Sequence, residues 1–186
     1  AGLVKGASQG AGLGNQFLSH IREVDAIIHV LRDFSDSNII REGSVDPKND
    51  KEVIETELAL ADLETVGKLI FNQEKELKAS KDPIEKTKLE ILDQLKGDLE
   101  AGNKVGLSYA RATEGKDERL KNWFNKLPLL SIKPVLFVYN VGEKEYAERP
   151  PAASDRNQVG NEIVICAKLE EELADYSEEE RLEYLK

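Results

Sequence analysis

Polar residues follow two short apolar runs of the sequence, at positions where α/β proteins bind their ligands. Asn140-Val141-Gly142-Glu143 comes at the end of the run PVLFVYN, and Cys166-Ala167-Lys168 ends the run NEIVICAK. In an open α/β sheet, ligands bind beyond the carboxyl ends of the strands. We therefore expect these two segments to lie at one edge of a sheet, where their side chains can contact a ligand.

A glycine-rich segment, AGLVKGASQGAGLGN, opens the sequence and precedes a third apolar run, AIIHVL. Its glycines allow backbone angles that other residues avoid, so the segment is predicted to be mobile. The five glycines are Gly2, Gly6, Gly10, Gly12 and Gly14. The last three superficially match a dinucleotide-binding fingerprint, but they follow no predicted strand, and we reject that interpretation.

Several other kinds of chemistry are not indicated. Cys166 is the single cysteine, so no internal disulfide is possible, and no histidine partner for a nucleophile stands near it. We expect Cys166 to be a small buried residue, and His20 and His29 to be structural. No cluster has the spacing of metal ligands. The phosphate-binding motif G-x-x-x-x-G-K-[ST] and methionine are both missing, so Ala1 is not expected to be a native start.

The composition fits one globular domain with an insertion: 186 residues, 40% hydrophobic and 33% charged. A net charge of −10 argues against a broad grip on nucleic-acid backbone, so direct DNA binding is not expected. Neither a secretory signal nor an apolar run of about 20 residues occurs, so no membrane association is expected. The single cysteine fits a reducing compartment, and we expect a cytoplasmic protein. The acidic run after Glu170 is typical of a solvated helix face.

Three strands, over residues 26–31, 134–140 and 161–168, are predicted from unbroken apolar runs separated by helical patterns, which indicates an α/β fold with a parallel sheet. A short helix is expected over 16–24. Two long amphipathic helices joined at Asp82-Pro83 predict a helical hairpin from about residue 50, followed by a short helix over 116–127. The segment 144–160 is a loop or a poor helix. Ser177 and Glu180 form a predicted capping box.

Four blocks of the sequence resemble the Obg-like ATPases (YchF type), a subfamily of the P-loop G proteins. The opening block, from AGLVKGASQG to DAIIHV, resembles the second switch region, which follows D-x-A-G in that family. NVGE resembles the family's N-x-x-E, which stands where most G proteins have N-K-x-D. ICAK resembles the loop usually written S-A-K, and VDPKNDKEVIETELALADLET resembles the start of the helical insertion. The resemblance covers nearly the whole chain in the right order.

This resemblance implies an incomplete P-loop NTPase (G domain) sheet with a coiled-coil-like hairpin insertion. The expected division is 1–49 for the switch region and first strand, 50–130 for the insertion, and 131–186 for the base-recognition loops and last helix. It also implies an intact parent that hydrolyses ATP, and possibly GTP, with Mg²⁺. The implied partners are the ribosome and the translation machinery. The metal-contacting Asp and the phosphate loop would lie upstream of Ala1, so these residues alone are expected to be inactive.

The resemblance also implies roles for individual residues. Gly2 would donate its backbone N–H to the γ-phosphate, within a switch formed by Leu3, Gly6, Gly10, Gly12 and Gly14. Leu3 stands where Ras-like proteins have the glutamine that orients water, and a leucine cannot do so. No catalytic residue is therefore assigned within the chain.

Base recognition would fall to the two loops after the strands. Asn140 would hold the base loop together, and Val141 would pack on the base. Glu143 replaces an aspartate that accepts two hydrogen bonds from guanine, and its longer side chain disfavours that match. Cys166, Ala167 and Lys168 would support the base, with the Ala167 N–H as a donor and Lys168 covering the ring.

Two alternatives stay open. The chain can be a non-catalytic protein-interaction module whose helical hairpin docks on a partner. It can also belong to a GTP-specific Obg-type GTPase, although Glu143, and Val141 in place of the usual lysine, disfavour this.

Overall fold

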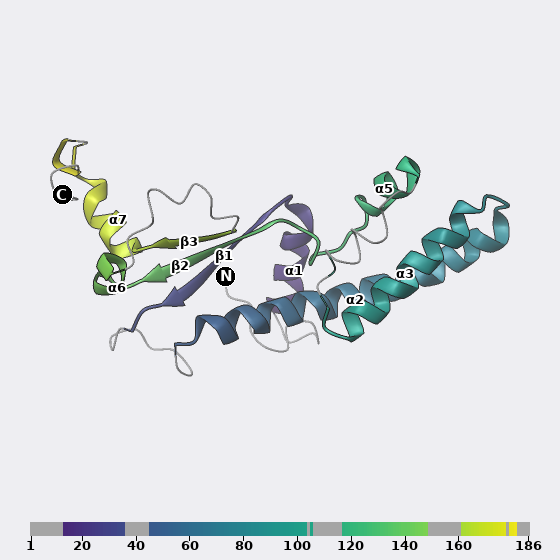
Figure 1. Ribbon diagram of the computed structural model, residues 1–186, viewed down its shortest axis with the longest axis horizontal. Helices are drawn as coiled ribbons and strands as arrows, with labels where there is room; N and C mark the ends of the chain where they lie inside the picture. Colours follow the sequence, from purple (N-terminus) through teal and green to yellow (C-terminus); the bar gives the residue numbers. More distant parts are fainter. Residues whose placement is uncertain are drawn as a thin grey trace. The chain divides into compact units, whose positions relative to one another are not determined.

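A parallel sheet and a long helical hairpin dominate the fold, which is a computed structural model (Figure 1). The structure describes residues 13–35, 45–103, 105, 117–148, 161–177 and 179–181. The elements in chain order are α1 (Leu13–Glu23), β1 (Ile27–Asp33), α2 (Pro47–Ala79), α3 (Ile84–Glu100), α5 (Glu118–Phe124), β2 (Val135–Val141), α6 (Glu143–Glu148), β3 (Glu162–Ile165) and α7 (Ala167–Ala174). They form two compact units, Ala1–Asp25 with Glu52–Lys133, and Ala26–Lys51 with Pro134–Lys186.

The sheet unit has three parallel strands in the order β1-β2-β3. Each strand ends beside its neighbour: Asp33 pairs with Val141, and Asn140 pairs with Ile165. The carboxyl ends of the strands therefore meet at one edge, as the apolar runs predict. The α/β class with a parallel sheet and long helices is confirmed.

The two faces of this sheet differ in exposure. On one face Leu31, Phe137 and Val141 are buried, and the Lys51 ammonium lies 3.7 Å from the centre of the Phe137 ring. On the other face Ile28 and Val30 of β1 are 67% and 61% exposed, whereas Val138 of the central strand β2 is buried. The alternation follows from the period of two along a strand.

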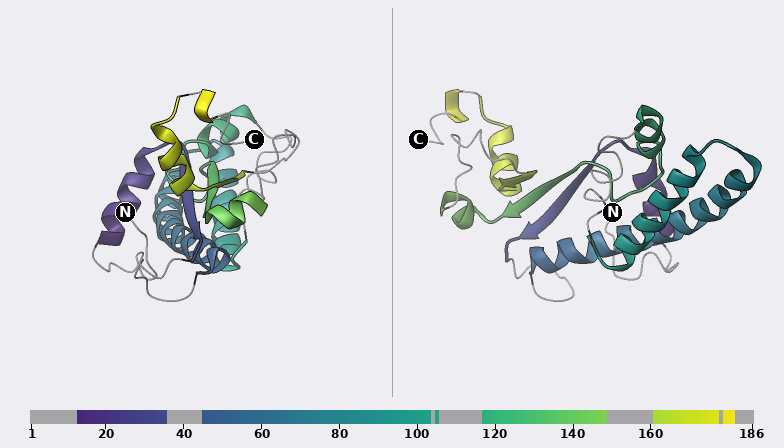
Figure 2. Two further views of the ribbon diagram at one scale, coloured as in Figure 1. Left: turned by 90° about the vertical axis from the view of Figure 1, so that its left-hand side faces the viewer. Right: turned by 45° about the vertical axis from the view of Figure 1, so that its right-hand side comes forward.

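The helical unit packs α2 against α3 as a hairpin, and both views of the chain show the two helices side by side (Figures 1 and 2). Apolar side chains from α2, α3 and α5, and from the segments next to α3 and α5, form its core. Within the helices these residues recur at helical spacing, which puts them on one face. The buried members of this core are Val66, Ile91, Leu92, Leu95, Leu99, Val105, Leu120, Phe124, Leu127 and Leu129.

A buried carboxylate fixes the segment that leads out of the helical unit. Asp62 on α2 is fully buried and accepts hydrogen bonds from the backbone N–H of Leu130 at 2.7 Å and of Ser131 at 2.8 Å. The Ser131 hydroxyl donates a third bond, at 2.5 Å. Burial raises the pKa of Asp62, while the three donors act in the opposite direction. No sequence pattern predicted this contact, because Leu130 and Ser131 follow Asp62 by 68 and 69 residues in the sequence.

The long helix α2 begins earlier than predicted. It starts at Pro47, three residues before the expected position near 50. The Asp46 carboxylate accepts a hydrogen bond from the N–H of Asn49 at 3.0 Å, as a helix N-cap does. Asp46-Pro47 is an N-cap followed by a proline at the first helical position, so the signal was present in the sequence.

The predicted third strand is too long. β3 ends at Ile165, and Ala167 and Lys168 begin α7. A six-residue helix, α6, occupies Glu143–Glu148 at the start of the segment predicted as a loop or a poor helix, whose residues 149–160 lie outside the described part. Helix α1 begins at Leu13 rather than 16 and takes in Gly14. The capping box is confirmed, because Ser177 and Glu180 bond reciprocally at 2.8 and 3.4 Å.

Candidate functional site

A hydrogen bond joins the end of β2 to the segment after β3 and holds the candidate site together. The side-chain oxygen of Asn140, the next-to-last residue of β2, accepts from the backbone N–H of Ala167 at 2.9 Å. Ala167 is the first residue of α7, so its N–H has no partner within the helix. The preceding residue, Cys166, gives no side-chain cap. Asn140 therefore caps α7 from another strand and holds the two predicted loops together.

A second contact joins the same loops through charged side chains. The Lys168 ammonium donates to the Glu143 carboxylate, with Nζ 2.5 Å from Oε1. Glu172, one turn further along α7, lies 3.8 Å from the same ammonium. The hydrogen bond to Glu143, and then the charges of Glu143 and Glu172, raise the pKa of Lys168. Three predicted site residues, Asn140, Glu143 and Lys168, are thus close together at the carboxyl edge of the sheet.

The remaining predicted site residues, Cys166, Val141 and Ala167, offer a ligand little beyond their backbone. Cys166 is 1% exposed, which confirms that it is a small buried residue. Val141 is 2% exposed and packs inside the sheet unit, because it ends β2 on the covered face. Its contact with a base stays a prediction, and little of its surface is open to a ligand. Ala167 offers a backbone N–H that Asn140 already occupies.

The predicted switch lies largely outside the described residues. Gly2, Leu3, Gly6, Gly10 and Gly12 all precede Leu13, so their predicted roles remain predictions. Gly14 lies in the first turn of α1.

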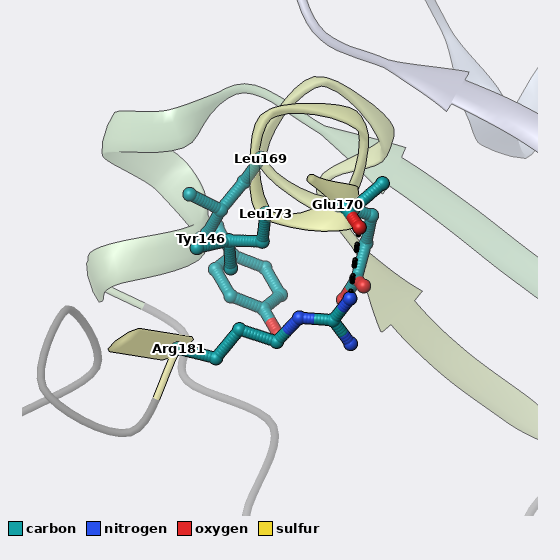
Figure 3. Close-up of a pocket in the computed structure, with 6 residues that line it drawn as sticks. Tyr146, Leu169, Glu170, Leu173 and Arg181 are labelled. Carbon is teal, nitrogen blue, oxygen red and sulfur yellow. Dashed lines mark hydrogen bonds between the residues drawn. The ribbon is translucent and has the colours of Figure 1, made fainter. Parts of the chain in front are cut away.

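A separate open pocket of about 330 Å³ lies beside α6 and α7 (Figure 3). Its lining residues are Tyr146, Leu169, Glu170, Leu173, Ala174 and Arg181. The Arg181 guanidinium donates to the backbone oxygens of Ala174 at 3.0 Å and Tyr176 at 3.1 Å, which satisfies carbonyls at the end of α7. Burial, followed by the nearby charge of Glu170, raises the pKa of Tyr146. None of the predicted site residues lines this pocket.

The side chains at the sheet edge can bind a polar ligand through hydrogen bonds and charge. The site offers a carboxylate and an ammonium on side chains that are 48% and 70% exposed, above a loop that Asn140 fixes. No group of three His, Cys, Asp or Glu residues that could hold a metal ion occurs among the described residues. No helix in that part of the chain is long and apolar enough to cross a membrane.

This geometry defines a class: an α/β domain in which the loops after two neighbouring parallel strands meet at the carboxyl edge of the sheet, where sheets of this kind bind their ligands. Known proteins agree with this class. The chain is 45% identical to the ribosome-binding ATPase YchF of Bacillus subtilis over 196 residues, covering 100% of this chain and 51% of that protein. It is 38% identical over 200 residues to Obg-like ATPase 1 of Oryza sativa subsp. indica, covering 99% and 47%.

A solved structure, that of the Schizosaccharomyces pombe YchF GTPase, matches with a TM-score of 0.67 and 33% identity. It covers 94% of this chain and 48% of that one. No protein-family model matches. The chain belongs to the YchF-type, or Obg-like ATPase, family, and it spans about half the length of the curated relatives it matches.

Proposed function

We propose that this chain is the base-reading portion of a P-loop nucleotide hydrolase that prefers ATP and acts as a ribosome-linked switch. The observation that carries the proposal is the Asn140–Ala167 hydrogen bond, together with Glu143 at the same edge. This arrangement puts the N-x-x-E segment and the C-A-K segment in one site, as base recognition requires. The similarity to proteins named ribosome-binding ATPases supports the nucleotide and the partner.

Asn140, Glu143 and Lys168 would contact or support the base of the nucleotide. Hydrolysis of ATP, in the presence of Mg²⁺, would remove the γ-phosphate and so let the glycine-rich switch relax. The 186 residues contain no G-x-x-x-x-G-K-[ST] motif, so this chain's own part in the reaction is to hold the base. The switch residues Gly2 and Leu3 would respond to the γ-phosphate.

Nucleotide binding by a full-length protein that carries this chain tests the proposal. We expect ATP to bind more tightly than GTP in calorimetric titrations with Mg²⁺. Tight GTP binding with no detectable ATP binding would contradict the base-reading argument and favour a GTP-specific protein.

The isolated 186-residue chain provides an independent test. We expect it to show no Mg²⁺-dependent ATP hydrolysis, because phosphate binding needs groups that its sequence does not contain. Measurable turnover by the purified chain, abolished by EDTA, would show that hydrolysis does not need a P-loop and would overturn the assignment.

A second candidate function, a protein-interaction module, is favoured by one exposed aromatic side chain. Phe71 on α2 is 58% exposed, and the Lys75 ammonium lies 4.0 Å from its ring centre. Exposed aromatic residues are enriched at protein interfaces. If the hairpin docks on ribosomes, co-sedimentation of the chain with ribosomes should weaken in Phe71→Ser, whereas an unchanged sedimented fraction would exclude this residue from the contact.

A further inference from the structure

Lys133 holds the C-terminal end of α1. Its ammonium donates to the backbone oxygen of Arg22 at 2.9 Å and to that of Val24. The last carbonyls of a helix have no partner within the helix, and the helix dipole favours a cation beside them. Lys133 therefore attaches the end of α1 to the segment that follows α5, although Lys133 and Arg22 are 111 residues apart in the sequence.

The buried carboxylate of Asp62 attaches the same segment to α2. It accepts from the backbone N–H groups of Leu130 and Ser131 and from the Ser131 hydroxyl. Lys133 follows two residues later, and its own N–H donates to the backbone oxygen of Leu130 at 3.2 Å, which closes a turn. Breaking the Asp62 contacts would leave a buried carboxylate and its donors unpaired, so the position of Lys133 beside α2 is firmly fixed.

A third contact joins α1 directly to α2. The Arg22 guanidinium donates to the Thr65 hydroxyl at 3.2 Å, and Thr65 lies about one turn beyond Asp62 on α2. Burial raises the pKa of Asp62, and the charge of Arg22 is among the influences that lower it. Helix α1 accordingly belongs to the same compact unit as the hairpin, even though β1 of the sheet unit begins at Ile27, close behind the end of α1 at Glu23.

These contacts have a consequence for the switch, because the glycine-rich segment leads directly into α1 in the sequence. In the proposed function this segment responds to the γ-phosphate, and a change in it reaches α1 through the chain. Because its end is bonded to Lys133 and Thr65, α1 cannot shift relative to α2 without breaking hydrogen bonds. A movement of α1 therefore takes α2, and the hairpin that α2 forms, with it.

We propose that Lys133 is the coupling residue of a conformational device, in which α1, the segment 130–133 and α2 move as one body and transmit the state of the bound nucleotide to the hairpin. This inference rests on the proposed function, which supplies the nucleotide and the switch. It adds the hairpin as the part that responds, and Lys133 as a positioning residue outside the candidate site. Coupling between two sites is reciprocal, so a partner bound to the hairpin would in turn change the affinity for ATP.

The test measures the distance between the hairpin and the sheet unit in the full-length protein that carries this chain. Spin labels are attached to cysteines introduced by Glu74→Cys on α2 and Glu171→Cys on α7, because both glutamates are exposed. Cys166 is 1% exposed and should not react, and exposed cysteines elsewhere in the protein are first replaced by serine. Pulsed electron paramagnetic resonance records the distance distribution with Mg²⁺ and either ADP or a non-hydrolysable ATP analogue.

Four variants separate the coupling from stability and from nucleotide binding. Lys133→Met removes the ammonium, and Lys133→Arg keeps a cation that can donate to the same carbonyls. Thr65→Val removes the acceptor of Arg22 and tests the device at a second point, should Lys133→Met fail to fold. Lys126→Met is the matched control, since Lys126 is an exposed lysine just after α5. Thermal melting checks the fold of each variant, and calorimetric titration checks that ATP still binds.

In the unchanged protein we expect the ATP analogue to shift the ratio of the hairpin populations by at least about fivefold relative to ADP, the lower end of typical coupling factors. Lys133→Met should bring this factor close to one and Thr65→Val should reduce it, whereas Lys133→Arg should retain most of it and Lys126→Met all of it.

Two results would overturn the inference: a full shift in folded Lys133→Met or, if that variant does not fold, in Thr65→Val; and an unchanged protein that binds ATP but shows the same distances in both nucleotide states. An unchanged protein that does not bind ATP would instead overturn the proposed function.

Discussion

The side-chain oxygen of Asn140 accepts a hydrogen bond from the backbone N–H of Ala167 at 2.9 Å. This bond supplies the N-cap that Cys166 does not give to α7, and it joins the two loops of the candidate site. One side chain therefore connects the fold with the proposed nucleotide site. Its removal should change stability and nucleotide affinity together.

Asn140→Ala leaves the Ala167 N–H without its acceptor. We expect the free energy of unfolding to fall by about 1 kcal/mol, the usual cost of losing a helix cap or a net hydrogen bond. ATP affinity of the full-length protein should fall as well, because the Glu143 and Lys168 segments lose their fixed spacing. Urea denaturation and calorimetric titration measure the two effects.

Asn161→Ala is the control for this change. Asn161 lies at the opposite end of the sheet, where its amide donates to the backbone oxygen of Val135 at 2.6 Å. A similar loss of stability with normal ATP affinity is expected. If Asn161→Ala weakens ATP binding as much as Asn140→Ala does, the effect comes from general destabilisation and not from the site.

The sequence predicted the site better than its supporting contacts. Apolar runs located all three strands, and their polar ends indicated Asn140, Glu143 and Lys168, since a parallel sheet brings such ends together. A helix was expected for the acidic run after Glu170, but its start at Ala167 was assigned to the third strand, because the cap of this helix comes from a residue 27 positions away. Local patterns cannot show a cap of that kind, because the N-cap rules concern neighbours in sequence.

Asp62 presents the same difficulty within the helical unit. An aspartate on a long charged helix is usually solvated, yet this one is fully buried against Leu130 and Ser131. Helical periodicity predicted the face of α2 but not which segment would cover it. The segment that covers this face is the one that follows α5, and its position depends on packing between residues that are far apart in the sequence.

Asp62→Ala should be one of the most destabilising changes in this unit. It leaves the backbone N–H groups of Leu130 and Ser131 without an acceptor, and each unsatisfied buried donor carries a desolvation cost. We expect a loss of about 2–4 kcal/mol in the free energy of unfolding, measured by urea denaturation. Asp93→Ala on the exposed face of α3 should change it by less than about 0.5 kcal/mol. Equal effects of the two changes would contradict the role assigned to Asp62.

Two phenylalanines provide a test of the hairpin core. Phe124 on α5 is 1% exposed and belongs to the core, whereas Phe71 on α2 is 58% exposed. Phe124→Ala should cost about 3–5 kcal/mol, because it removes buried apolar surface and leaves a cavity. Phe71→Ala should cost much less. The fluorescence of Trp123, the single tryptophan, reports unfolding of this unit. A small effect of Phe124→Ala would mean that α5 does not pack as described.

The tip of the hairpin predicts a pH dependence centred on Glu85. Its carboxylate accepts from the Gln73 amide at 2.6 Å and from the Lys88 ammonium at 3.0 Å. The hydrogen bond from Gln73, followed by that from Lys88, lowers the pKa of Glu85 below its ordinary value of 4.5. An acid whose pKa is lower in the folded state stabilises the fold above its unfolded pKa, and this contribution is lost as the pH falls through the folded pKa.

Glu85→Gln should therefore destabilise the chain at pH 7, by about 1–2 kcal/mol for hydrogen bonds to a charged group. The difference in unfolding free energy between the unchanged chain and this variant should shrink once the pH falls below about 4.5. Glu90→Gln is the control, because Glu90 is an exposed glutamate on the same helix, 3.6 Å from Lys86. Its effect should stay below about 0.5 kcal/mol at every pH. Urea denaturation between pH 3 and pH 7 distinguishes the cases: a Glu85→Gln difference that stays constant over this range would show that the charge of Glu85 does not stabilise the hairpin.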